Sequence, residues 1–150
     1  MIRPSTRFAA LVSAGLPALA VAAALATPGA GVSGRVLASG RSPDGIVVSR
    51  AGATDVTVRE IAIAPGGSTG WHYHDGPVIA VVKSGTLTRT LHDCSTETTT
   101  AGGAFVEPAG RDQVHVGRNL GTEPVVLLVT YVLSAGQELA RDAAAAPCSR

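Results

Sequence analysis

Short apolar segments separated by turn residues follow one another from residue 54 to residue 133. Within these segments apolar and polar residues alternate with a period of two, which is the pattern of a strand with one buried face. The segments expected as strands are 54–64, 71–74, 77–83, 85–91, 105–106, 114–116 and 125–133, with a shorter apolar run at 46–49 before them. Turns at roughly eight- to twelve-residue spacing are typical of a sandwich or barrel. The sequence therefore predicts an all-β fold of one domain.

The last part of the chain is less regular. Ser134 and Gln137 have the spacing of a capping box, and the alanine-rich stretch after them could continue as a helix. An extended arm fits the same residues. We therefore divide the chain into a barrel at 46–134 and a C-terminal tail at 135–150, preceded by a glycine- and serine-rich linker at 27–45.

Residues 1–26 have the pattern of a targeting segment. Two arginines without any acidic residue come first, and an apolar run at 8–26 ends in Ala24-Leu25-Ala26, the small residues that a signal peptidase requires. Because Gly15 and Pro17 interrupt this run, a cleaved signal peptide is favoured over an uncleaved membrane anchor. We expect a secreted or periplasmic protein that is not held in the membrane after cleavage.

The charge of the mature chain excludes one class of partner. The leader contains two of the 12 basic residues, Arg3 and Arg7, so its removal leaves 10 basic residues against 11 acidic ones. A chain with this balance lacks the excess of basic residues that nucleic-acid binders use to neutralise phosphates. We expect a small molecule as the ligand and no nucleic acid.

Export also changes how the two cysteines are interpreted. Cys94 and Cys148 are an even pair, and a disulfide is the expected state of such a pair in an oxidising compartment. The alternative is two free thiols. A disulfide would tie the C-terminal tail to the body of the barrel.

Three of the four histidines have a spacing that suits a metal ion. His72 and His74 flank Tyr73 in a predicted strand, so both imidazoles lie on one face of it. His115 lies two residues after Gln113 in a later strand. Imidazoles from separate strands can form a three-nitrogen site that leaves coordination positions open for a substrate.

The sequence around these histidines resembles the two motifs of the cupin superfamily. GGSTGWHYHDGPVIAVVKSG is similar to the first motif and GGAFVEPAGRDQVHVGRN to the second, in the expected order. The matching positions are Gly66, His72, His74 and Gly85 in the first motif, and Gly102, Pro108, Gly110, His115 and Asn119 in the second. The resemblance implies a small cupin barrel, a double-stranded β-helix or jelly roll. It also implies a divalent transition metal, such as Fe, Mn, Zn, Ni or Cu, held by the three histidines in the barrel mouth.

The sequence departs from the family pattern at two places. The glutamate of the first motif should be residue 78 or 79, where this chain has Val78 and Ile79. The second motif has two extra residues before His115, which put Gln113 at the usual histidine offset. Gln113 or Glu107 could approach the ion as an additional pocket residue, although neither position follows from the motif.

The sequence leaves two main functions open. The first is a metal-dependent enzyme of the oxygenase type. The second is a non-enzymatic cupin that binds a small ligand without a metal, which the aliphatic pocket positions Val78, Ala80 and Val82 suit equally well. The third possible function is a structural or partner-binding module. A homodimer formed through an exposed strand edge is compatible with all three functions.

Overall fold

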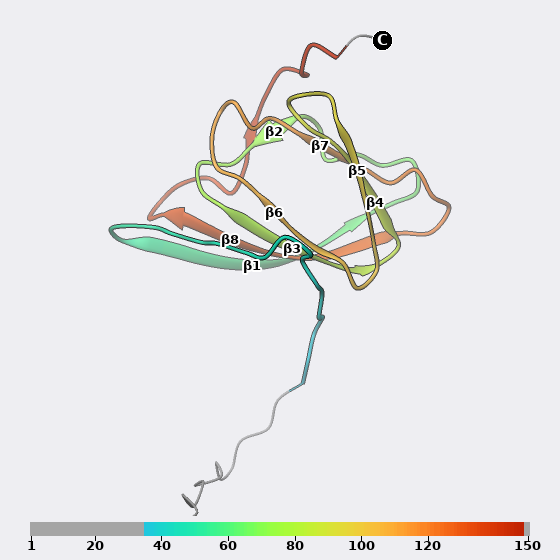
Figure 1. The fold of residues 1–150 in the computed structure, drawn as a ribbon, viewed down its shortest axis with the longest axis horizontal. Helices are drawn as coiled ribbons and strands as arrows, with labels where there is room; N and C mark the ends of the chain where they lie inside the picture. Colours follow the sequence, from blue (N-terminus) through green and yellow to red (C-terminus); the bar gives the residue numbers. More distant parts are fainter. Residues whose placement is uncertain (1–34, 149–150) are drawn as a thin grey trace, which may run out of the picture. The chain divides into compact units, whose positions relative to one another are not determined.

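Two antiparallel sheets face each other in the computed structural model, which describes residues 35–148 (Figure 1). Four strands in the order β1-β8-β3-β6 form the larger sheet, and β5-β4-β7 form the smaller one. The strands of the larger sheet are β1 (Thr54–Ile63), β8 (Val125–Ser134), β3 (Val78–Ser84) and β6 (Ala104–Glu107). Those of the smaller sheet are β5 (Thr96–Thr100), β4 (Thr86–Thr90) and β7 (Val116–Arg118). A separate pair joins β2 (His72–Tyr73) to β9 (Arg141–Asp142). The predicted all-β class is confirmed.

The barrel core is built from the inward-facing positions of β3 and β8. Buried and partly buried residues alternate along the whole of β8, as expected for a strand with one face toward the core. In β3 the three predicted pocket positions Val78, Ala80 and Val82 are all buried. Leu87 from β4 and Phe105 from β6 complete the same hydrophobic cluster, so both sheets contribute to one aliphatic core.

The apolar residues of β1 change phase along the strand, from Val56 and Val58 in its first half to Ile61 and Ile63 in its second half. Its first half presents Val56 and Val58 to the outside, where they are 65% and 62% exposed. Its second half turns Ile61 and Ile63 toward the core. Because β1 pairs only with β8, its first half is free of the packing that requires alternation in the central strands.

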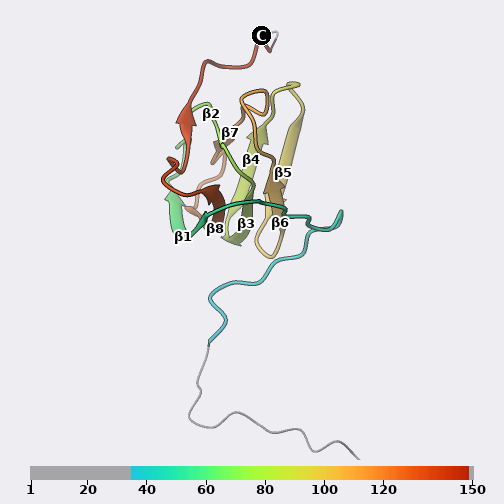
Figure 2. The same cartoon turned by 90° about the vertical axis from the view of Figure 1, so that its left-hand side faces the viewer.

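Three segments differ from the sequence prediction. The apolar run at 46–49 forms no strand, and its residues are exposed and pair with no sheet. Strand β5 was not predicted, because its sequence TETTT has no apolar alternation; threonine favours strands, and an edge strand with both faces largely exposed needs no apolar face. The helix considered for the tail is wrong. Residues 135–148 form no helix, and their extended arm adds β9 to β2 (Figure 2).

Other predictions fall outside the part of the chain that the structure describes. The expected signal segment at 1–26 and the first part of the linker, 27–34, lie there. Within residues 35–148, no helix has the length and apolarity that crossing a membrane would require.

The two cysteines lie together, as the sequence predicts. The Cα atoms of Cys94 and Cys148 are 5.4 Å apart and their sulfur atoms are at disulfide distance. Cys94 occupies the turn between β4 and β5, where the backbone N–H of Cys94 donates to the carbonyl of Leu91 at 2.9 Å. The pair therefore connects this hairpin to the end of the C-terminal arm.

Asn119, which matches the last position of the second motif, has a structural role. Its buried side-chain amide donates to the carbonyls of Ile63 and Glu123 at 2.9 and 2.8 Å, and its oxygen accepts from the N–H of Gly121 at 3.0 Å. The side chain thus fixes the loop between β7 and β8 against the end of β1.

We expect Asn119→Ala to lower the free energy of unfolding by about 2–3 kcal/mol, because it leaves buried backbone groups without partners. Urea denaturation of the oxidised protein measures this change. Leu120→Ala is the matched control, since Leu120 is adjacent and 71% exposed; it should change stability by less than about 0.5 kcal/mol. Equal effects of the two substitutions would contradict the structural role of Asn119.

Candidate metal centre

A backbone bridge brings the two motifs together. The N–H of His72 donates to the carbonyl of His115 at 3.0 Å, and the N–H of His115 donates back to the carbonyl of His72 at 2.9 Å. This pairing places the imidazoles of His72 and His115 with their centroids 4.5 Å apart. His74 lies 4.9 Å from His72 on the same face of the strand. The three histidines that the sequence singled out therefore lie in one cluster.

Glu107 completes this cluster. It is the last residue of β6, and one carboxylate oxygen lies 3.1 Å from Nε2 of His74 while the other lies 3.4 Å from Nε2 of His115. One side-chain ligand atom from each of the four residues lies within 4.8 Å of those of the others. We refer to His72, His74, Glu107 and His115 as the histidine–glutamate cluster.

The strand register of the larger sheet explains why the carboxylate of the cluster comes from Glu107 on β6. Glu107 is directly opposite Val78 in the antiparallel pair of β3 and β6. Val78 is one of the two positions at which the first motif should have its glutamate. Side chains of directly opposite residues lie on the same face with their Cβ atoms about 5 Å apart. A carboxylate on β6 can therefore reach nearly the same space as one on β3.

The hydrogen bonds of the Nδ1 atoms determine the tautomers of the three imidazoles. Nδ1 of His72 lies 2.9 Å from the carbonyl of Gly70, and Nδ1 of His115 lies 2.8 Å from that of Gln113. Nδ1 of His74 lies 2.7 Å from the carbonyl of Leu139. Because a carbonyl can only accept, each neutral ring carries its proton on Nδ1 and directs the Nε2 lone pair toward the cluster centre.

These lone pairs and the carboxylate are all acceptors. Acceptors at such distances repel each other unless a cation, either a proton or a metal ion, lies between them. In the described part of the chain, Nε2 of His115 is one of two buried side-chain nitrogens without a hydrogen-bond partner. The donor set therefore fits a metal ion, and three imidazoles with one carboxylate suit a transition metal better than magnesium or calcium.

The cluster shifts the pKa values of its members. Burial by itself would raise the pKa of Glu107, but the neighbouring imidazoles of His115 and His74 outweigh it and hold that pKa far below its usual range. Burial by itself would lower the pKa of His115, and the Glu107 carboxylate outweighs it and raises that pKa. For His72 burial dominates, assisted by the charges of His115 and His74, and lowers the pKa. At neutral pH the cluster thus holds an ionised carboxylate beside a His72 that resists protonation.

Arg89 lies behind Glu107 and was not predicted as a site residue. Its guanidinium is 3.8 Å from the Glu107 carboxylate, forms an ion pair with Glu97, and lies 3.6 Å above the ring centroid of Phe105. An arginine in a strand normally extends into solvent, but this one is only 4% exposed. Its charge and packing hold Glu107 on the cluster side of β6.

Two cavities adjoin the cluster. A cavity of about 40 Å³ in the barrel interior is bounded by His72, His74, Glu107, Tyr131 and aliphatic side chains. Tyr131, another residue that the sequence did not single out, has its ring centroid 5.7 Å from that of His74, and burial raises its pKa. A second cavity of about 240 Å³ reaches Glu107 and His115 from the side of the β4–β5 hairpin. The first has room for an ion with one or two waters, whereas the second can admit a small organic molecule.

Gln113 is not part of the histidine–glutamate cluster. Its side-chain amide donates to Asp112 at 3.3 Å, and its side chain lines the second cavity. The two extra residues of the second motif thus place His115, and not Gln113, opposite His72.

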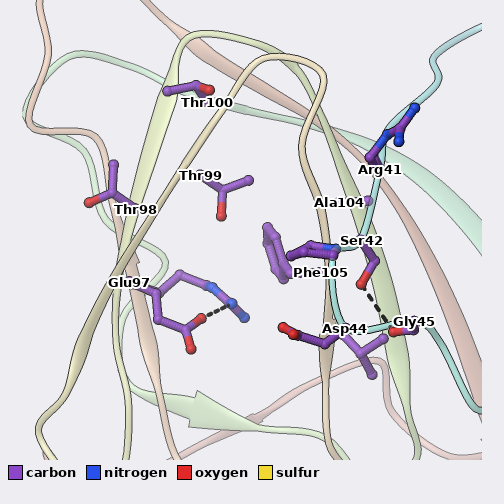
Figure 3. A pocket seen from close by; sticks show the side chains of 13 residues that line it. Arg41, Ser42, Asp44, Gly45, Glu97, Thr98, Thr99, Thr100, Ala104 and Phe105 are labelled. Atoms are coloured by element: carbon purple, nitrogen blue, oxygen red, sulfur yellow. Dashed lines mark hydrogen bonds and ion pairs between the residues drawn. The ribbon is translucent and has the colours of Figure 1, made fainter.

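A third pocket, of about 590 Å³, lies outside the cluster (Figure 3). Arg41 to Gly45 form one wall and the threonines of β5 form another. It shares Arg89, Glu97 and Val106 with the second cavity but contains none of the four cluster residues.

The fold and the cluster define a small β-barrel with a candidate metal centre where β2, β6 and β7 meet. The family model described as a Cupin domain matches residues 59–131. These residues therefore form a cupin domain.

Solved structures share the fold of this domain. The polyketide cyclase RemF from Streptomyces resistomycificus is 22% identical, with a TM-score of 0.52 over 64% of this chain and 65% of that chain. A structure of the DMSP lyases RdDddP and RnDddQII is 26% identical, with a TM-score of 0.51 over 59% of this chain and 44% of that chain. The present chain thus spans less than two thirds of the length of either. No curated protein matches the sequence.

Proposed function

We propose that the histidine–glutamate cluster binds one divalent transition metal ion through Nε2 of His72, His74 and His115 and a carboxylate oxygen of Glu107. The observation that carries this proposal is the convergence of four acceptors within 4.8 Å, with each imidazole oriented by a backbone carbonyl. Oriented imidazoles of this kind are characteristic of metal ligands. The carboxylate also compensates half of the charge of a divalent ion in a site with little access to water.

The bound ion would supply Lewis-acid or redox chemistry, depending on whether it is Zn or one of Fe, Mn, Ni and Cu. The residues of the chain have separate roles around it. Arg89 keeps Glu107 oriented, hydrophobic walls exclude water, and Tyr131, whose phenol stays protonated at neutral pH, lines the inner cavity beside His74.

We propose further that the ligand is a small molecule and that the protein is an enzyme. A set of four protein donors leaves positions open on a six-coordinate ion, and the second cavity gives a small substrate a path to that ion. The DMSP lyases and the cyclase RemF, which share the fold, are enzymes. An oxygenase-type reaction requires a redox-active ion. In the alternative, a metal-free ligand binder, protons on the imidazoles would have to take the place of the metal ion beside Glu107.

We also propose that the protein is secreted and that it forms a homodimer. The Cys94–Cys148 pair is consistent with an oxidising compartment, and the predicted signal segment at 1–26 points to export. A homodimer would form most readily at edge strand β1, where Val56 and Val58 are exposed.

The protein, purified without a chelator or a histidine tag, should contain about one transition metal ion per chain by elemental analysis. His115→Ala should lose that ion and keep the circular dichroism spectrum of the barrel, because the substitution removes a donor and little of the core. His92→Ala is the control, since His92 is exposed and lies outside the cluster; it should retain the metal. Full metal content in His115→Ala would refute the ligand set.

Glu107→Gln should weaken metal binding at least about a hundredfold, since the amide keeps the shape of the side chain and loses its charge. Competition with a chromophoric chelator measures the dissociation constant. Glu97→Gln is the matched control, because Glu97 also pairs with Arg89 but lies outside the cluster. Similar losses in both variants would assign the effect to Arg89 and not to coordination by Glu107.

The pairing of β3 with β6 leads to a second prediction about Glu107 as a metal ligand. In the Glu107→Val background, Val78→Glu should restore most of the metal affinity, because the new carboxylate starts from the cross-strand position of the same face. Ile79→Glu in that background should not restore it, since the neighbouring residue points to the opposite face of the sheet. Rescue by both substitutions, or by neither, would contradict the placement of the fourth ligand.

A further inference from the structure

The C-terminal arm, residues 135–148, contributes directly to the surroundings of the histidine–glutamate cluster. The imidazoles of His72 and His115 each find the acceptor for Nδ1 two residues away in their own segment. His74 differs, because its acceptor is the carbonyl of Leu139, 65 residues later in the chain. His74 is only 2% exposed, so no solvent molecule can easily replace that carbonyl.

Several contacts hold the arm along the strand that carries His72 and His74. Strand β9 pairs with β2, and the N–H of Ala143 donates to the carbonyl of Trp71 at 2.9 Å. Arg141 forms an ion pair with Asp75 at 2.6 Å. The side chain of Leu139 packs against the core. The carbonyl of Leu139 is therefore placed by both packing and pairing.

The far end of the arm is fixed by the cysteine pair. Cys148 is joined to Cys94 in the β4–β5 hairpin, 54 positions earlier in the sequence. The arm leaves β8 of the larger sheet, follows β2, and ends at a hairpin of the smaller sheet (Figure 2). Without this bond, the short β2–β9 pairing and one ion pair would be the main restraints on the segment after Leu139.

We propose that the disulfide-tethered arm is a working part of the metal centre, with the carbonyl of Leu139 as the positioning group for His74. This inference rests on the proposed metal function. Loss of the tether lets the arm separate from β2, and His74 then loses the acceptor that keeps its proton on Nδ1. The ring can rotate or present an N–H at Nε2, and in either state it is a poorer ligand. The state of the Cys94–Cys148 bond therefore sets the affinity for the metal.

The first test compares the oxidised wild-type protein with Cys94→Ser/Cys148→Ser, in which no free thiolate is left to bind metal. The dissociation constant for Zn²⁺ alone, measured with competing chelators of graded strength, should rise about 10- to 100-fold, as for loss of other partners of metal-binding histidines. Arg141→Ala, which loosens the arm and leaves the disulfide intact, should shift the constant in the same direction by a smaller factor. Unchanged constants in both variants would overturn the proposal.

The second test separates positioning from general loosening of the fold. In a His74→Ala background, removal of the disulfide should have no further effect on Zn²⁺ affinity, because the arm acts through His74. In the matched His72→Ala background it should still weaken binding about tenfold or more, since Gly70 holds His72 independently of the arm. Equal losses in the two backgrounds would show a merely structural role and overturn the inference. A wild-type protein that binds Zn²⁺ no better than His72→Ala and His74→Ala would instead refute the metal centre, and this proposal with it.

Discussion

The mutual repulsion of four acceptors is the constraint on which this site depends. Three Nε2 lone pairs and a carboxylate converge within 4.8 Å in a region largely shielded from solvent. The backbone holds them there, because the bridge between His72 and His115 fixes two of the rings and the β3–β6 ladder fixes Glu107. The strands thus hold together four groups that need a proton or a metal ion between them, and such a cation makes their interaction attractive.

The position of the carboxylate shows that a ligand set is defined in space and not by sequence offset. Val78 stands where the first motif has a glutamate, and the strand that pairs with it supplies Glu107 in its place. A carboxylate on β6 can replace one on β3 because the side chains of directly opposite residues in an antiparallel pair lie on the same face of the sheet. This replacement also changes the surroundings of the carboxylate, since β6 brings it within 3.8 Å of the buried Arg89.

The features that the sequence predicts are those encoded locally. The spacing of His72 and His74 determines that both rings share a face, and the alternation along 125–133 determines the buried face of β8. To predict the positions of Glu107 and Arg89 in the site, the strand register must be known, and this register depends on contacts between distant segments. The polar strand β5 was missed, and the choice between a helix and an extended arm for the tail was left open, for a related reason. The conformation of both segments is set by pairing with β4 and β2 and not by their own periodicity.

The three histidines illustrate this difference within one site. His72 and His115 take their outer acceptors from carbonyls two residues away, so the segment that provides the ligand also provides its orientation. The Nδ1 of His74 takes its acceptor from the carbonyl of Leu139 in the C-terminal arm. The end of this arm is held by the bond of Cys148 to Cys94 in the smaller sheet. The orientation of one ligand is therefore linked to the covalent state of a bond outside the cluster, whereas the other two are not. In a cupin barrel whose candidate ligands come from three separate segments, the proposed role of the arm makes residues 135–148 a condition for the complete donor set.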